Sequence, residues 1–244
     1  MRNLMFKVAY DGSKYHGFQR QDNAWTVQEA IEDGLKTLLK EDVKIIGASR
    51  TDAGVHAKGQ VFNLKVDTPI PVERFPLALN TKLPRDIIII DTIDVDDDFH
   101  ARYNSKDKVY SYQIYNNNIP SPFVRNYAYH IKRKLDLNKM REGASYLIGK
   151  YDFSSFRSAG CNAKTSIREI FSIDIEKSNN LIVIRIKGGG FLYKMVRIIM
   201  GTLIKVGLNK IDPKGVQKIL LAKDRQQAGP TAPACGLFLE KIYY

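Results

Sequence analysis

Residues 46–60 form a short polar segment between two apolar runs, and this arrangement strongly constrains how the chain folds. The runs at residues 43–48 and 60–66 have the apolar, β-branched composition that is typical of strands. Small residues surround the polar side chains, and Gly47 and Gly54 permit backbone conformations with positive φ. We therefore expect a loop that is held at both ends by a sheet, which is a common place for catalytic residues.

The reactive side chains of this loop are Arg50, Asp52 and His56. In an ordinary connection, Asp52 would cap a turn and Arg50 would pair with it. The whole string Arg-Thr-Asp-Ala-Gly-Val-His-Ala, however, resembles the catalytic loop of the tRNA pseudouridine synthase A family. The resemblance implies that Asp52 is the nucleophile. We expect Arg50 to contact the flipped nucleotide or its phosphate, and His56 to hydrogen-bond the loop backbone as scaffolding.

Length and charge set the domain count and the class of partner. The 244 residues can form one large domain or two subdomains. A new strand pattern starts after about residue 103, so we expect an N-terminal subdomain at 1–103 with the catalytic loop and a C-terminal subdomain at 104–244. Lysine and arginine number 38 against 26 acidic residues, which gives a formal net charge of +12. Such an excess favours a polyanionic partner, usually nucleic acid.

Neither a disulfide framework nor a metal centre is predicted. Cys161 and Cys235 are far apart and have no partners at metal-ligand spacing. No segment has the apolar length needed to cross a bilayer, and residues 1–7 lack the apolar region of a signal peptide. We therefore expect a soluble, cytoplasmic protein with no membrane partner.

Periodicity predicts strands and helices in both halves of the chain. A capping box, Thr26 with Glu29, starts an amphipathic helix, and Asp136 caps another. The longest apolar helix is predicted at residues 191–206 and should be largely buried. Strands are predicted at residues 4–10, 43–48, 60–66, 87–90, 106–115, 171–175, 182–186 and 237–243, and further helices at 71–80 and after Asp212.

Three more candidate site residues lie in the second half, each in a motif that resembles the same family. In Lys-Val-Tyr-Ser-Tyr, at residues 108–112, the resemblance places Tyr110 against the target base. In Met-Val-Arg, it pairs Arg197 with the catalytic aspartate; the alternative is an arginine that reaches solvent along its aliphatic stem. In Ala-Cys-Gly-Leu, it makes Leu237 an apolar wall of the base pocket, although an ordinary strand end looks the same.

The resemblance covers nearly the whole chain and therefore implies a fold and an activity. It implies an α+β fold with a mixed, mainly antiparallel central sheet shared by two similar subdomains, helices packed outside and an active-site cleft between them. It further implies isomerisation of uridine to pseudouridine at positions 38, 39 and/or 40 of the tRNA anticodon stem-loop, by a homodimer. Because the reaction needs no redox change, group donor or metal, we expect no cofactor and no metal.

Two other classes of function fit parts of the sequence. A non-catalytic RNA-binding module would explain the positive charge and the interleaved aromatic residues. A metal-dependent hydrolase would use Asp52, His56 and the cluster from Asp96 to His100. A run of acidic residues in a turn, however, is more typical of a solvated surface.

Overall fold

The computed structural model describes residues 1–161 and 163–244, and these divide into two compact units. Unit 1 comprises Met1–Lys106 and Phe238–Tyr244, and unit 2 comprises Asp107–Leu237. The chain thus changes unit three residues later than we expected. Residues 238–244, which we expected in the C-terminal subdomain, belong instead to unit 1. The reason is a non-local pairing, in which Phe238 and Leu239 run parallel to His56 and Ala57.

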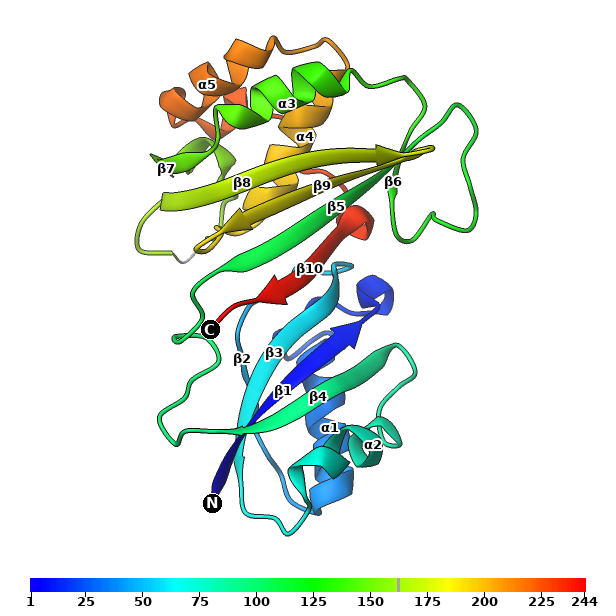
Figure 1. The fold of residues 1–244 in the computed structure, drawn as a ribbon, viewed down its shortest axis with the longest axis vertical. Helices are drawn as coiled ribbons and strands as arrows, with labels where there is room; N and C mark the ends of the chain where they lie inside the picture. The colour runs from blue at the N-terminus through cyan, green and yellow to red at the C-terminus, as the bar shows by residue number, and fades with distance from the viewer. Residues whose placement is uncertain (162) are drawn as a thin grey trace. The chain divides into compact units, whose positions relative to one another are not determined.

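Unit 1 is a sheet with two helices against one of its faces (Figure 1). The strand order is β4-β1-β3-β10, β2 pairs with β3, and β1 is antiparallel to both β3 and β4. Alternate residues of β1 are buried, and Phe6 stacks on Phe62 with ring centroids 4.7 Å apart. The elements are β1 (Arg2–Tyr10), α1 (Val27–Leu39), β2 (Ile46–Gly47), β3 (His56–Val66), α2 (Phe75–Asn80), β4 (Ile87–Val95) and β10 (Leu237–Ile242).

Unit 2 repeats this design with three helices gathered on one side of its sheet (Figure 1). The order β5-β9-β8-β7 is antiparallel throughout, and β6 runs parallel to β5. The β8–β9 hairpin turns at Asn179, whose φ is 52°. The elements are β5 (Lys108–Asn116), β6 (Tyr129–Ile131), α3 (Leu137–Ser145), β7 (Gly149–Asp152), β8 (Ile167–Ser178), β9 (Leu181–Gly188), α4 (Met195–Gly207) and α5 (Pro213–Ala222).

The α+β class and the mixed, mainly antiparallel pairing are therefore confirmed, whereas several element boundaries differ from the prediction. The run at residues 43–48 forms only the two-residue strand β2. The long apolar helix starts at Met195 rather than at residue 191, because Lys194 has a left-handed φ of 57°. The isoleucine run of β4, the last strand of its sheet in unit 1, alternates between buried side chains, Ile87 and Ile89, and exposed ones, Ile88 and Ile90.

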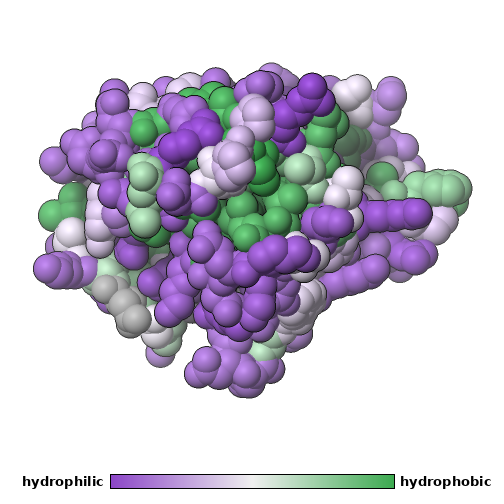
Figure 2. All heavy atoms as spheres, turned by 90° about the horizontal axis from the view of Figure 1, so that it is seen from below, coloured by the Kyte–Doolittle hydropathy of each residue, from purple (hydrophilic) through white to green (hydrophobic). Residues whose placement is uncertain are grey.

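The surface is mainly hydrophilic in the view of Figure 2, where one central group of apolar side chains is bordered by polar and charged ones. Exposed apolar side chains of unit 1 include those of β4, with Ile88, Ile90 and Ile93 each between 43% and 46% exposed. Among the described residues, no helix combines the length and the apolar character needed to cross a membrane.

Candidate active site

The segment between β2 and β3 is a tight loop that carries Asp52 near its tip. Backbone hydrogen bonds close the loop at two levels, from Ala48 N to Val61 O (2.8 Å) and from Val55 N to Asp52 O (3.1 Å). The Asp52 side chain is half-buried, whereas Arg50 is exposed. The loop therefore has a fixed backbone and presents a carboxylate that a ligand can still reach.

Thr51, directly before Asp52, is held by two segments of unit 1. Its hydroxyl lies 2.8 Å from the hydroxyl of Tyr10, at the end of β1, and this contact is buried. Its carbonyl accepts from the backbone N–H of Phe18 (3.2 Å). Both contacts fix the backbone on the N-terminal side of Asp52, so the place from which its side chain starts is set by β1 and by the loop that follows β1.

This following loop can lie against the Asp52 loop only because it contains glycine at the contact points. A Cβ placed on Gly17 would lie 2.5 Å from the carbonyl oxygen of Thr51, and Gly17 has a φ of +95°. A Cβ placed on Gly12 would lie 2.0 Å from the carbonyl oxygen of Val55. Any other residue at Gly17 would meet both a steric clash and a backbone penalty.

His56 is the first residue of β3, and not a loop residue as we expected. Its side chain is buried, and its Nδ1 lies 3.1 Å from both the backbone N of Gly12 and Oδ1 of Asp11. When the Gly12 N–H donates to Nδ1, that nitrogen carries no proton, so Asp11 is then not an ion-pair partner. The ring stacks on Phe238 at 4.6 Å. These contacts join His56 to the loop that follows β1, and its scaffolding role stays a prediction.

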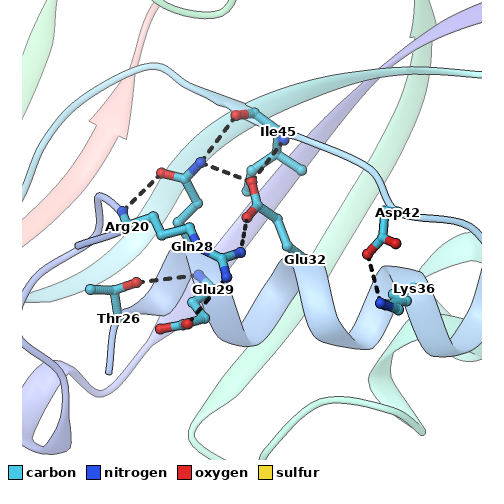
Figure 3. A network of polar contacts seen from close by, with 8 residues as sticks. All are labelled: Arg20, Thr26, Gln28, Glu29, Glu32, Lys36, Asp42 and Ile45. Carbon is cyan, nitrogen blue, oxygen red and sulfur yellow. Dashed lines mark hydrogen bonds and ion pairs between the residues drawn. The ribbon is translucent and has the colours of Figure 1, made fainter. Parts of the chain in front are cut away.

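Helix α1 fixes the chain just before the Asp52 loop through a buried carboxylate (Figure 3). Glu32 accepts from the backbone N–H of Ile45 (3.1 Å), from Nε2 of Gln28 (2.9 Å) and from Nη1 of Arg20 (3.0 Å). Ile45 immediately precedes β2, so the Glu32 network sets where the strand that leads into the loop begins. The helix itself starts as predicted, with Thr26 accepting from Glu29 N.

In unit 2, the predicted base contact Tyr110 lies on β5 and is only 6% exposed. Its ring meets the ring of Phe191 edge to face, with centroids 5.3 Å apart. Tyr112, two residues further on the same side of the strand, is fully buried and donates its hydroxyl to Pro233 O (2.9 Å). Burial raises the pKa of Tyr112, so this hydroxyl keeps its proton.

Arg197 lies in α4 and is half-buried, and its guanidinium is hydrogen-bonded within unit 2. Nε donates to Ala232 O (2.8 Å), and Ala232 N donates to Arg197 O (3.0 Å). The side chain is thus anchored at Nε, while part of it remains exposed. Its predicted partner, Asp52, belongs to unit 1, and the pairing stays a prediction.

The loop before Leu237 packs against both α4 and β5. It lies so close to α4 that a Cβ on Gly201 would be 1.8 Å from Pro230 O, and Gly229 N donates to the hydroxyl of Thr202 (2.9 Å). Its other end packs on β5, where a Cβ on Gly236 would be 2.7 Å from Gln113 O. Leu237, which follows directly, is buried. The predicted site residues of unit 2 therefore lie on or beside this loop: Arg197 on α4, Tyr110 on β5 and Leu237 at the end of the loop.

Three residues that shape these surroundings were given no role at the site from the sequence: Tyr10, Gly17 and Tyr112. Each acts through a contact with a residue distant in the sequence. Local signals were present, because Tyr10 and Gly17 lie in short strings, residues 10–12 and 17–21, that resemble another motif of the same family, and Tyr112 shares a strand face with Tyr110.

In the acidic turn at residues 94–100, the side chains of Asp94 and His100 contact other protein groups. Asp94 forms an ion pair with Arg2 at 2.7 Å, and Nδ1 of His100 accepts from the backbone N–H of Arg102 (3.2 Å). Within residues 1–161 and 163–244, no three side chains of the metal-ligating types come together. These contacts fit a surface turn.

The sequence of this chain is similar to those of known proteins, and the similarity identifies its family. The family model described as tRNA pseudouridine synthase matches residues 7–104 and 144–244. The proteins named tRNA pseudouridine synthase A of Acetivibrio thermocellus and of Thermoanaerobacter pseudethanolicus are 50% and 51% identical to this chain over 244 residues, which is the whole of both sequences in each case. A Clostridium perfringens protein named tRNA pseudouridine synthase A 2 is 46% identical over the same full length. The chain belongs to the tRNA pseudouridine synthase family.

Proposed function

We propose that this protein converts uridine to pseudouridine at positions 38, 39 and/or 40 of the tRNA anticodon stem-loop, with Asp52 as the nucleophile. In this isomerisation the bond between N1 of uracil and C1′ of ribose breaks, and a bond between C5 and C1′ forms. The proton on C5 is lost to solvent and N1 gains one, so no electron acceptor or group donor takes part. We propose accordingly that the enzyme works without a cofactor.

The observation that carries this proposal is the intact string from Arg50 to Ala57, which spans the end of the loop and the start of β3 and whose backbone is fixed on both sides of Asp52. Covalent catalysis needs a nucleophile that is positioned but still accessible. The contacts of Thr51 with Tyr10 and Phe18 supply the positioning, and the half-buried state of Asp52 leaves access. Attack of the carboxylate at C1′ of the sugar and attack at C6 of the base both meet these requirements.

The remaining roles follow the motifs that carry the other predicted residues. We assign Tyr110 to stacking against the uracil, and Leu237 to an apolar wall that keeps the detached base in place. Arg50 is exposed, and it would either contact the phosphate of the flipped nucleotide or insert into the space that this nucleotide leaves. Arg197 would neutralise the carboxylate of Asp52, a role supported by the hydrogen bond from its Nε to Ala232 O, which holds the guanidinium in place.

We further propose that the enzyme acts in the cytoplasm and as a homodimer, as the family resemblance implies. The exposed isoleucines of β4 supply apolar surface on which a second subunit could pack. Sedimentation equilibrium of the full chain measures the association directly. A mass of one chain at micromolar concentration would contradict the homodimer without bearing on the reaction.

Position-resolved mapping of pseudouridine in an unmodified tRNA transcript tests the activity. The transcript is incubated with the purified enzyme, with and without EDTA, and then mapped chemically over its whole length. We expect conversion confined to positions 38–40 and equal in both samples. Tight binding without any conversion would support a non-catalytic RNA-binding module instead, and activity abolished by EDTA would support a metal-dependent enzyme.

A further inference from the structure

The positive charge of the chain is concentrated in unit 2. Of the 38 lysines and arginines, 16 lie in unit 1 and 22 in unit 2; of the 26 acidic residues, 17 lie in unit 1 and 9 in unit 2. Unit 1 therefore carries a formal charge of −1 and unit 2 a charge of +13. The phosphate backbone of RNA is negatively charged, so its electrostatic attraction to unit 2 is much stronger than its attraction to unit 1, which carries Asp52.

Within unit 2, the connection between β7 and β8 is a preformed loop. Phe153 N donates to Ser166 O (3.0 Å) across its base, and the buried hydroxyl of Ser155 donates to Ile219 O (2.6 Å) at the end of α5. Phe153 and Phe156 are buried beneath it. Its outer part surrounds a depression of about 350 Å³, which is lined by Ser154, Arg157, Ser158, Ala159, Gly160 and Cys161.

Two guanidinium groups of this loop region interact with carbonyl oxygens rather than with carboxylates. Arg157 donates to Cys161 O (2.5 Å) and to the hydroxyl of Ser166 (3.1 Å). Arg168 donates to Thr165 O (3.0 Å) and to Ile167 O (2.6 Å). Among the residues that the structure describes, neither guanidinium has a carboxylate within ion-pair distance. The carboxylate at the base of the loop is occupied elsewhere, because Asp152 accepts from Ser154 and pairs with Lys223 at 3.5 Å.

The two guanidinium groups are also close enough to influence each other electrostatically. Burial lowers the pKa of Arg168; the Cys161 thiol acts in the opposite direction, and the nearby positive charge of Arg157 lowers the pKa further. Two neighbouring cations that are partly withdrawn from water repel each other, and a bound anion would remove that cost. Lys164 lies between Arg157 and Arg168 in the sequence, and its exposed side chain adds a third positive charge to the same loop.

We propose that residues 154–161 and 163–168 form a docking site for the RNA backbone, in which Arg157, at the depression, and Arg168 and Lys164, elsewhere in the same loop, contact phosphate groups of the tRNA. The proposal rests on the proposed function for the identity of the RNA. The loop is fixed to α5 before the ligand arrives, so binding needs little ordering of the backbone. Phosphate contacts of this kind supply affinity and register rather than sequence preference.

Salt dependence of tRNA binding tests the docking site separately from catalysis. Binding of an unmodified tRNA transcript is measured by fluorescence anisotropy from 50 to 300 mM KCl, with Asp52→Ala as the parent so that no turnover occurs. Lys164→Ala and Arg168→Ala are compared with Lys177→Ala, which removes the same charge from an exposed position at the far end of β8. Lys164→Ala is included because Arg168 also hydrogen-bonds its own loop, so a loss in Arg168→Ala alone has two explanations.

Each loop variant is expected to lower the slope of log K against log salt by about 1, as for one lost phosphate contact, while Lys177→Ala keeps the parent slope. Equal slopes in all four proteins, or no tRNA binding by the parent, would overturn the docking site. Lowered slopes together with a wild-type enzyme that makes no pseudouridine would contradict the proposed reaction but leave the docking site standing.

Discussion

The carboxylate of Asp52 depends on a neighbour for its orientation. Thr51 is held through its side chain by Tyr10 and through its carbonyl by Phe18, and these contacts come from a strand end and a loop more than thirty residues earlier. A displacement of about 1 Å at a reacting group is enough to slow an enzyme strongly. Tyr10 is therefore a positioning residue in this account, because it acts on Asp52 through Thr51.

Tyr10→Phe removes the hydroxyl that meets Thr51 and keeps the ring that packs near Phe18, at a centroid distance of 6.2 Å. One buried hydrogen bond contributes about 0.5–1.5 kcal/mol, so we expect kcat to fall about three- to tenfold with KM for tRNA unchanged. Steady-state kinetics with unmodified tRNA measure both constants. Tyr146→Phe, at a half-buried site directly after α3, is the matched control. An unchanged kcat in Tyr10→Phe would show that Thr51 needs no such support.

Arg197 provides a second prediction at this scale, because its charge and its geometry can be separated. Arg197→Lys keeps a positive charge but loses the Nε donor to Ala232 O, whereas Arg197→Ala loses both. We expect turnover to fall by about two to three orders of magnitude in Arg197→Ala and by less in Arg197→Lys. Single-turnover rates at saturating enzyme give this comparison. Equal losses in the two variants would show that the hydrogen bond to the loop matters and the charge does not.

Helix α1 contributes to the site without touching it. Its buried Glu32 accepts three hydrogen bonds, one of them from the backbone of Ile45, where the chain turns toward the Asp52 loop (Figure 3). The same helix carries a second ion pair, between Lys36 and Asp42, in which both side chains are exposed. One helix thus offers a buried and an exposed interaction for comparison.

Glu32→Ala should lower the free energy of unfolding by about 1–3 kcal/mol, because it removes the acceptor of the Ile45 N–H and one of the two acceptors of the Gln28 amide. Lys36→Ala, the control, should change it by less than about 1 kcal/mol, since exposed ion pairs contribute little. Urea unfolding followed by circular dichroism measures both changes. Equal effects in the two variants would mean that the Glu32 network does not stabilise unit 1.

Most elements follow from local sequence patterns, and the exceptions have a common cause. The capping box at Thr26, the cap at Asp136 and the alternation along β5 gave elements close to those observed. The length of β2, the exposure of β4 and the membership of β10 in unit 1 depend on which strands become neighbours. Strand neighbours are non-local, so periodicity within one segment leaves them undetermined.

The candidate site divides in the same way. Asp52 could be predicted because its motif is contiguous, and Tyr110, Arg197 and Leu237 because each lies in a short motif of its own. The support around them could not: Tyr10 is 41 residues from Thr51, and Tyr112 is 121 residues from Pro233. These contacts arise only after the sheets form, which explains why the sequence identified candidates for the chemistry but missed the residues that hold them.

At the scale of the whole molecule, charge and chemistry are distributed unequally between the two units. Unit 1 holds the Asp52 loop and is close to neutral, whereas unit 2 carries the positive charge together with Tyr110 and Arg197. A substrate as large and as acidic as tRNA suits this division, because backbone contacts can supply affinity while the loop supplies the reaction. Binding and turnover should therefore be separable by mutation.

Release of tritium from tRNA labelled at C5 of uridine, measured for Asp52→Asn beside Asp98→Asn, tests the central claim most directly. Asp98 is an exposed residue of the acidic turn and controls for the loss of one carboxylate. We predict that Asp52→Asn releases no tritium above background yet binds tRNA as the wild type does, and that Asp98→Asn retains full activity. Tritium release by Asp52→Asn at the wild-type rate would contradict the account.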